Sequence, residues 1–448
     1  MFRKIIATSV SVALVVTSST AGAAGFALIE QNASGIGNAY AGQAASAQDA
    51  STIFFNPAGM TLLPGRQVVG AIHAISPKAG FNNSGTTTLA PLQTRLGSNG
   101  GDAGDLAFVP NLYLSWQLTP SVFVGIGVNA PFGLKTEYSP EWMGRFHGIT
   151  SEVKTININP SVAYKVNDMI SLGFGVNYQR INATLSNAVN YSAAAFGAGG
   201  GAALAAVGGA GVEGIANVTG DDNSWGYNLG AMFNLSPATR LGVSYRSAIK
   251  HTLTGTAAFS GRPAALAAAI PDGGVTADIK LPDSASASLF HKVNPKWDLL
   301  ADVSWQGWST VQSLNIVRTN GVLLASTPLS YKDSWRFSLG ANYHVNDAWT
   351  LRGGVAYDQT PVPDFDRTVR IPDGNRTWLA LGGQYRVSKA TAIDFGYAHL
   401  FVKDPTIDEC SPAQAAANPA IVCAGKNRVN GSYSNNVNIL SLQLRMNF

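Results

Sequence analysis

Residues able to catalyse a reaction are scattered along this sequence and form no recognisable motif. An activated nucleophile needs a base and an orienting acid beside it, yet the chain has no Gly-x-Ser-x-Gly and no His-Glu-x-x-His sequence. Only His344 has clear inward parity on a predicted strand, and an isolated histidine there is usually structural. The others are His73, His147, His251, His291 and His399. We therefore expect no catalytic centre, no metal and no cofactor.

Three basic residues are candidates for holding an anionic ligand. In the segment 331–345, bulky hydrophobic residues fall at every second position, namely Trp335, Phe337 and Leu339. In a strand the opposite face then carries Lys332 and Arg336, and Arg352 has the same parity in the next segment. Any of the three suits a ligand carboxylate. The alternative is a network that merely anchors an internal segment, with acidic partners among Asp333, Asp358 and Asp394.

The two cysteines, Cys410 and Cys423, lie close together in a polar stretch and match no metal-binding spacing. In an oxidising compartment, closing a loop of this size contributes about 3 kcal/mol. We expect a structural disulfide between them.

The element that positions these side chains is a strand repeated many times. Hydrophobic residues alternate with small polar ones in fourteen segments: 66–77, 106–118, 122–134, 151–166, 170–186, 224–235, 240–258, 280–293, 297–308, 331–345, 349–359, 376–387, 391–402 and 433–448. Short connections alternate with long ones, and the chain ends in an alternating strand that finishes on Phe448. An even number of such strands predicts an all-β fold, a 14-stranded antiparallel transmembrane β-barrel. A soluble β-sandwich is the alternative.

The first residues predict export. Residues 1–23 combine Arg3 and Lys4 with an apolar run and the small residues Ala21, Gly22 and Ala23, which is typical of a signal peptide. No later run is long and apolar enough for a membrane-spanning helix, and charged residues make up only 12% of the chain. We expect the outer membrane of a Gram-negative bacterium. The net charge of +4 gives no reason to expect nucleic acid.

Residues 24–65 lack strand alternation and are rich in Gly and Ala. Small residues allow close backbone approach, which suits a crowded enclosed space. Asn56, Pro57 and Ala58 end any helix begun before them. We expect this segment to plug a barrel formed by 66–448; an ordinary N-terminal domain of two short helices is the alternative.

Two long connections are unusually apolar. Residues 193–216 are mostly Ala and Gly, and a run of Ala, Leu and Ile follows Arg262–Pro263. Apolar material on exposed loops often marks a binding surface, and the candidates are Phe196, Leu204, Leu266 and Ile270. A flexible low-complexity loop across the barrel mouth is the alternative for the first connection.

Several motifs resemble the FadL/TodX family of outer-membrane transporters of hydrophobic compounds. They are Ala24–Gly25–Phe26, Ser34–Gly35–x–Gly37–x–Ala39–Tyr40, Asn56–Pro57–Ala58, Asn223–x–Trp225–Gly226–Tyr227, Tyr331–Lys332–Asp333–x–Trp335–Arg336, Pro361–Val362–Pro363 and Ile371–Pro372–Asp373–x–x–Arg376–x–Trp378–Leu379. The best matches are to the long-chain fatty acid transporters of that family.

The resemblance implies uptake of long-chain fatty acids, with an N-terminal hatch in the lumen and ligand capture between the third and fourth outer loops. It implies an inner pocket at Ala24 and Phe26, and sideways exit at a kink in the third strand. Pro131, Phe132 and Gly133 lie at that position, and Pro131 and Gly133 weaken strand pairing on local grounds too.

The sequence departs from the family where a basic pocket residue is expected, since Asn187 and Thr327 stand there. Uptake of aromatic hydrocarbons by the same route is therefore an alternative, and a lipid-hydrolysing outer-membrane enzyme is a more distant one. Expected partners are hydrophobic small molecules and outer-membrane lipid, and we expect a monomer.

Overall fold

The computed structural model describes residues 25–417 and 423–448. The predicted signal peptide, 1–23, and Ala24 lie outside the described residues. No helix in the described part of the chain is long and apolar enough to cross a membrane.

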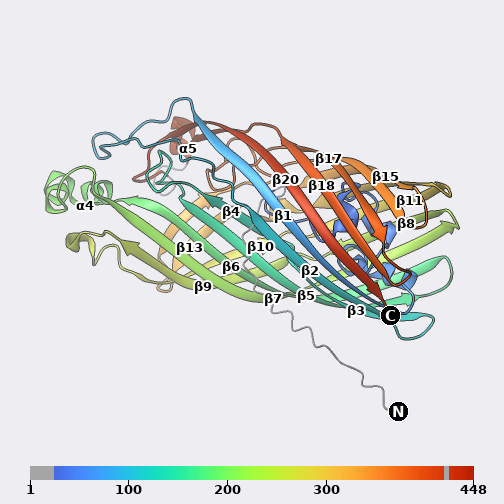
Figure 1. Ribbon diagram of the computed structural model, residues 1–448. Coiled ribbons are helices and arrows are strands. Elements are labelled where there is room, and N and C mark those ends of the chain that lie inside the picture. The colour runs from blue at the N-terminus through green and yellow to red at the C-terminus, as the bar shows by residue number, and fades with distance from the viewer. Residues whose placement is uncertain (1–24, 418–422) are drawn as a thin grey trace, which may run out of the picture.

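The chain forms a closed barrel of 14 antiparallel strands, as predicted (Figure 1). The last strand closes the barrel by pairing with the first, from Gln67↔Asn447 to Asn83↔Gly431. In chain order the strands are β1 (Arg66–Asn83), β2 (Ala107–Gln117), β3 (Val122–Asn129) continued by β4 (Gly133–Glu137), β5 (Thr150–Lys165), β6 (Ile170–Asn190), β7 (Glu213–Ser236), β8 (Thr239–Arg246) continued by β9 (Ile249–Ser260), β10 (Gly273–Leu281) continued by β11 (Ser284–Asn294), β12 (Trp297–Gln306) continued by β13 (Ser313–Arg318), β14 (Leu323–Pro328) continued by β15 (Ser334–His344), β16 (Trp349–Asp358), β17 (Arg376–Arg386), β18 (Thr391–Val402) continued by β19 (Thr406–Glu409), and β20 (Val429–Asn447).

The two-residue alternation separates the faces of the wall. On β2, Leu112, Leu114 and Trp116 are exposed on the outside, whereas Tyr113 and Ser115 are buried on the inside. Apolar outward residues and small or polar inward ones are the pattern of a barrel whose outside meets lipid.

The two ends of the barrel differ. One carries the short connections and the C-terminus, and we call it the short-turn end; the other, the long-loop end, carries α4 (Tyr191–Ala206) and α5 (Pro412–Ala417). Several strands reach further into the predicted loops than expected: β7 begins at Glu213, and β13 and β14 form a hairpin within 309–330. Alternation is weak in these extensions because neither face is consistently apolar.

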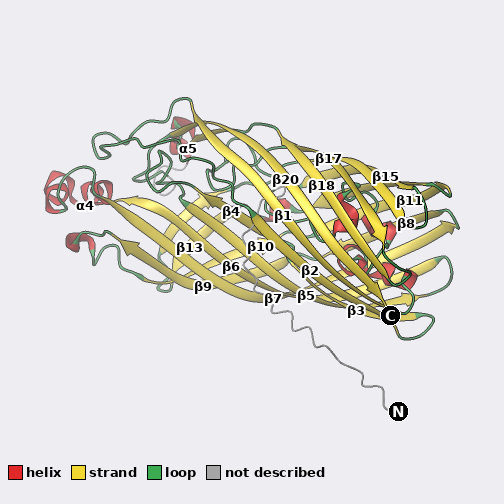
Figure 2. Cartoon of the chain, viewed as in Figure 1, coloured by secondary structure: helices red, strands yellow, loops and turns green. Residues whose placement is uncertain are grey.

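The N-terminal segment lies inside the barrel towards the short-turn end (Figure 2). It contains α1 (Ala33–Ile36), α2 (Gln43–Ser46), α3 (Thr52–Phe55) and the 3-10 helix η1 (Pro57–Leu62). Its small residues have a local cause: a Cβ on Gly37 would lie 2.8 Å from Gly382 Cα of the wall. Backbone therefore packs on backbone, which side chains of ordinary size would prevent.

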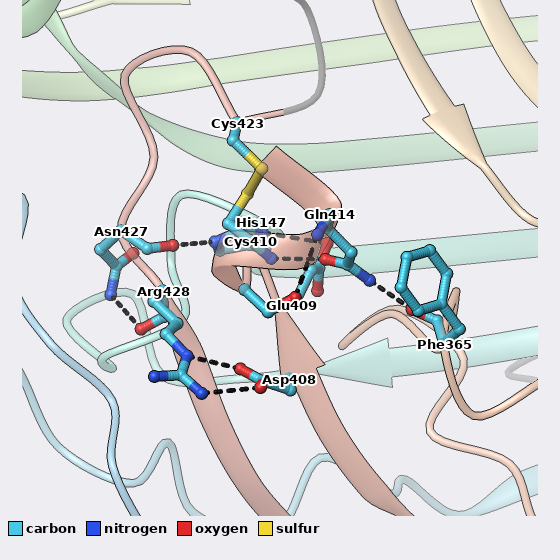
Figure 3. The surroundings of a disulfide bond; sticks show 10 residues. His147, Phe365, Asp408, Glu409, Cys410, Gln414, Cys423, Asn427 and Arg428 are labelled. Atoms are coloured by element: carbon cyan, nitrogen blue, oxygen red, sulfur yellow. Dashed lines mark hydrogen bonds and ion pairs between the residues drawn. A yellow bond between two sulfur atoms is a disulfide. The ribbon is translucent and has the colours of Figure 1, made fainter. Parts of the chain in front are cut away.

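The predicted disulfide joins Cys410 to Cys423 at the start of α5 (Figure 3). Beside it, His147 Nδ1 lies 2.9 Å from Glu409 Oε1, and Arg428 forms an ion pair with Asp408 (2.6 Å). The first contact ties the last long loop to the loop that contains His147, and the second lies within the last long loop, next to the start of β20. The remaining short helices are η2 (Ala264–Leu266) and η3 (Trp308–Thr310).

Candidate functional site

The third strand of the wall is broken where the sequence predicted it. β3 pairs with β5 up to Asn129↔Asn157, and β4 resumes at Gly133↔Lys154. Residues 130–132 therefore lie opposite only two residues of β5, 155 and 156. Because of this one extra residue, the positions that face inward change from even to odd, or the reverse, across the break. Pro131 has no N–H for the ladder, which explains why the break lies here.

The break leaves a gap in the wall beside β2. Pairing of β2 with β3 stops at Leu112↔Val128, and in the described part of the chain β4 pairs only with β5. Higher up, the edges meet again through the Lys135–Asp105 ion pair and a hydrogen bond from Glu137 N to Ala103 O (3.1 Å).

The N-terminal segment lies across this gap from the inside. Ala27 forms an antiparallel bridge with Phe132. Leu28 N donates to Pro131 O, and Gly133 N donates to Phe26 O, both at 2.8 Å. The chain thus adds a short internal strand to the broken edge.

Side chains complete the closure on both edges. Gln31 Nε2 donates to Ala130 O on the kink side (3.0 Å). On the β2 side, Asn111 Nδ2 donates to Glu30 O (3.0 Å). The segment 26–31 is therefore hydrogen-bonded to both sides of the gap.

Phe26 is buried in an aromatic cluster at the gap. Its ring lies 4.7 Å from that of Trp308 and 6.0 Å from that of Phe132. Just before it, Gly25 N donates to Asp373 Oδ2 (2.8 Å). Gly25 has φ +65 and lies so close to Trp308 that a Cβ would clash at 2.8 Å. The Phe26 ring is thus held in a fixed position inside the barrel.

A cavity of about 160 Å³ lies between the N-terminal segment and the far wall. Its lining includes Leu28, Pro131 and Phe132 together with Arg336 and Arg246. One water needs roughly 10–15 Å³ on this measure, so the void is far larger than a hydration site.

Arg336 faces inward, as predicted, and lines this cavity. Its Nη2 donates to Ala39 O (2.7 Å), while Nε and Nη1 are buried with no hydrogen-bond partner among the described residues. A buried guanidinium with unused donors is suited to bind a carboxylate. Asp302 and Asp358 also line the cavity and temper its positive charge.

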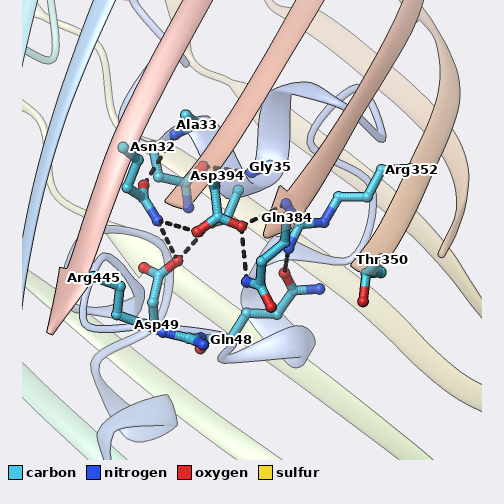
Figure 4. Close-up of polar contacts among 12 residues, drawn as sticks. Asn32, Ala33, Gly35, Gln48, Asp49, Thr350, Arg352, Gln384, Asp394 and Arg445 are labelled. Carbon is cyan, nitrogen blue, oxygen red and sulfur yellow. Dashed lines mark hydrogen bonds and ion pairs between the residues drawn. The ribbon is translucent and has the colours of Figure 1, made fainter. Parts of the chain in front are cut away.

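The other two basic candidates are placed differently. Lys332 precedes β15 and its side chain is exposed, so its predicted inward direction is wrong; the strand begins three residues later than expected. Arg352 is buried, but its Nη1 donates to Asp394 Oδ1 (2.7 Å) and its Nη2 to Gln48 Oε1 (2.9 Å) (Figure 4). Arg352 thus belongs to the anchoring network that the sequence left as the alternative.

That network ties the internal segment to one side of the wall. Gln443 Nε2 on β20 donates to Asp49 Oδ2 (2.9 Å), and Arg445 Nη1 donates to Gln48 O (2.9 Å). Asp49 also accepts from Ser34 Oγ (2.6 Å). The helices α1 and α2 are therefore fastened to β16, β18 and β20.

Asn56, Pro57 and Ala58 fasten the segment to the opposite wall. Asn56 Nδ2 donates to Ala44 O (2.7 Å) and to Ala231 O on β7 (3.0 Å), and its Oδ1 caps Ala58 N (3.1 Å). The wall residue that faces Asn56 is Gly230, and any side chain there would clash, because a Cβ on Gly230 would lie 2.0 Å from Asn56 Oδ1.

A second, more apolar cavity of about 80 Å³ lies nearer the long loops. Strands β5, β6, β7, β9, β10 and β13 supply its lining, which includes Ile181, Leu253 and Val275. Ile181 and Leu253 also belong to the hydrophobic cluster that contains Phe26 and Trp308. Apolar contacts are therefore continuous from the long-loop end to the aromatic cluster.

The two apolar loops pack together above this cavity. Leu204 on α4 and Ile270 are half-buried in one cluster with Leu266. Phe196 is instead 49% exposed and stands outside the cluster. The glycine-rich connection is a helix, α4, broken at Gly199 and Gly200.

Sequence reasoning missed three side chains of this site. Arg246 and Trp308 have the inward parity of the predicted segments 240–258 and 297–308, because Leu241, Val243, Leu299 and Val303 lie on the outside, so the alternation could have indicated both. Arg370 comes from a long loop, yet its Nη2 donates to Asn187 Oδ1 (3.2 Å). Burial lowers the pKa of Arg370 to about 10. Arg370 therefore brings a basic side chain to Asn187, the position where the family resemblance led us to expect a basic residue.

Comparison with known proteins decides the family. A family model described as outer membrane protein transport protein (OMPP1/FadL/TodX) matches residues 14–448. The chain belongs to this family. The long-chain fatty acid transport protein of Escherichia coli (strain K12) is 30% identical over 424 residues, covering 90% of this chain and 93% of the relative.

Solved structures of the FadL/TodX family share the fold. A FadL homologue from Pseudomonas aeruginosa has a TM-score of 0.84 at 26% identity, covering 95% of this chain and 100% of the other. The Pseudomonas putida toluene transporter TodX has a TM-score of 0.63 at 20% identity, covering 89% and 94%. The chain is thus an outer-membrane β-barrel of a Gram-negative bacterium, so the short-turn end faces the periplasm and the long-loop end faces outward.

Replacing Asn56 tests the fastening of the internal segment. In Asn56→Ala, the Ala58 N–H and the carbonyls of Ala44 and Ala231 lose a buried partner, at about 1–3 kcal/mol for each group left unsatisfied. We expect the segment to loosen and the barrel to leak small ions. Single-channel conductance in planar bilayers measures this.

The matched control is Thr61→Val, which removes one hydroxyl contact of the same segment with the wall, at Ser171 (2.8 Å). It should remain closed. A closed Asn56→Ala channel would show that Asn56 does not hold the segment in place.

Proposed function

We propose that this protein takes up long-chain fatty acids, or molecules of similar hydrophobicity, by passive movement through the barrel wall. The observation that carries the proposal is the cavity that ends at the wall gap. Its lining includes both Leu28 of the closing segment and Pro131 of the broken strand. A ligand in the cavity is therefore separated from the gap only by the closing segment, whose hydrogen bonds to the broken strand can be replaced by contacts with the ligand.

Capture begins at the outer loops. Leu204, Leu266 and Ile270 pack in one apolar cluster at the outer loops. The upper cavity shares Ile181 and Leu253 with the cluster that contains Phe26. Phe196, on α4 but outside this cluster, offers a further exposed apolar side chain at the same end of the barrel. Burying each methylene contributes about 0.8 kcal/mol, so an alkyl chain gains free energy as it moves inward.

The hatch in this proposal is the segment 24–65, and opening concerns its first residues. Displacing Phe26 and Leu28 would break the internal strand at Pro131 and Gly133. The remainder stays fastened through Asn56 and Arg352. A lateral gap in the bilayer region then lets an apolar ligand leave without an aqueous channel.

The charge of Arg336 favours a fatty acid over a neutral hydrocarbon. Two of its guanidinium nitrogens have no partner in the described part of the chain, and a carboxylate would satisfy them. The upper cavity favours the second candidate, aromatic hydrocarbons, because its lining is almost wholly apolar. One similar curated protein is named a long-chain fatty acid transport protein, which supports the first.

Closing the gap tests the route. Deleting Ala130 removes the extra residue, and Pro131→Thr supplies the missing N–H, so β3 and β4 become one strand. We expect uptake of labelled oleate, in cells lacking their own transporter, to fall by about ten-fold or more because the strand is then continuous. Surface level should not change.

Pro131→Thr alone is the matched control. It keeps the extra residue and therefore the gap, so oleate uptake should stay within about two-fold of the wild type. Normal uptake by the deletion variant would show that ligand does not leave through this gap.

Replacing Arg336 tests the choice of ligand. Arg336→Met should weaken oleate binding by roughly ten-fold or more, since a hydrogen bond to a charged group contributes about 1.5–3 kcal/mol. Toluene binding should not change, and Arg336→Lys should recover part of the oleate affinity. Titration of purified protein with each probe measures both. Equal loss for oleate and toluene would mean that Arg336 only supports the structure.

A further inference from the structure

A row of amide side chains runs along the inner wall from the broken strand to the central cavity. Every member is at most 2% exposed. The members are Asn129 on β3, Asn157 and Asn159 on β5, Asn177 on β6 and Asn228 on β7. Soluble cores rarely bury so many amides together.

The row is continuous. Asn157 Nδ2 donates to Asn129 Oδ1 (3.2 Å) and to Asn177 Oδ1 (3.0 Å). Asn177 Nδ2 and Asn159 Nδ2 both donate to Asn228 Oδ1, at 3.1 and 2.9 Å. At the cavity end, Arg246 Nη1 donates to Asn177 Oδ1.

A glycine makes this continuity possible. A Cβ on Gly175 would lie 2.5 Å from Asn228 Oδ1 and 2.6 Å from Asn159 Nδ2. Any other residue at this position would separate the two amides. The wall thus leaves room for the row.

The two ends of the row coincide with the two ends of the proposed route. Arg246 and Asn228 line the central cavity. Asn129 is the last residue of β3 before the gap, and its Nδ2 lies beside the Tyr113 hydroxyl but makes no hydrogen bond of good geometry among the described residues. A buried donor left unused is costly, and here it lies at the place of exit.

The internal segment covers the row. Arg246 Nη2 donates to Phe54 O (3.0 Å), and Asn228 Nδ2 donates to Ile53 O (3.4 Å). The Arg246 guanidinium also lies 4.4 Å from the Phe54 ring. Movement of α3 would therefore uncover the row from the cavity side.

We propose that this row is a track for the polar head group of the ligand, from Arg246 in the cavity to Asn129 at the wall gap. A carboxylate loses most of its hydration inside the barrel, which is costly unless hydrogen-bond donors replace the water. Asn129 supplies a donor directly, and the other amides supply theirs in steps as they exchange the hydrogen bonds that they now make to one another. The inference rests on the proposed function and identifies its ligand as an amphipathic acid.

Asn129→Asp tests the track, because Asp has the same shape and keeps the oxygen that accepts from Asn157. It replaces the unused donor with a negatively charged oxygen, which repels a carboxylate at the exit. In cells lacking their own transporter, initial uptake of labelled oleate should fall by about ten-fold, equivalent to a barrier increase of about 1.4 kcal/mol. Uptake of labelled methyl oleate, which has no charge, should stay within about two-fold.

Asn129→Ala is the second variant, and it removes the donor without adding a charge. It should reduce oleate uptake less than Asn129→Asp does and leave methyl oleate unaffected. Equal losses for both probes, or no loss for either, would overturn the track and leave the row as a fastening for α3. A wild-type protein that takes up neither probe would overturn the proposed function itself and the track with it.

Discussion

Backbone groups at a break in a membrane barrel need partners, because lipid offers none. Here one surplus residue in the third strand creates the break. The internal chain supplies the missing partners, Leu28 N for Pro131 O and Phe26 O for Gly133 N. The buried aromatic cluster fixes Phe26 in the position that this pairing requires. The same hydrogen bonds thus close the wall and hold the start of the N-terminal segment in place.

The strength of the closure suits displacement by a ligand. Two backbone hydrogen bonds and those of the Gln31, Asn111 and Tyr113 side chains join the segment to the edges of the gap. At about 1 kcal/mol net for each bond, roughly six methylenes moving out of water would match them. The other fastenings, at Asn56 and Arg352, involve more extensive buried networks and hold the rest of the segment.

Sequence periodicity was sufficient for the barrel, because two-residue alternation and strand length follow directly from the lipid environment. The break at Pro131 was also predictable, since proline lacks an N–H. The direction of Lys332 was not, because parity arguments assume an uninterrupted strand and Lys332 lies before β15 begins. Contacts such as Arg370 with Asn187 join segments far apart in the chain, so no local pattern could indicate them.

The central claim is that the pairing of Ala27 with Phe132 closes the wall and must separate for uptake. These two residues form a non-hydrogen-bonded antiparallel pair, with Cα atoms about 4.5 Å apart, within reach of a disulfide. The direct measurement is oleate uptake by Ala27→Cys/Phe132→Cys in a background with Ser at 410 and 423. The oxidised protein should not transport, and reduction should restore uptake to the level before oxidation. Undiminished uptake by fully cross-linked protein would contradict the account.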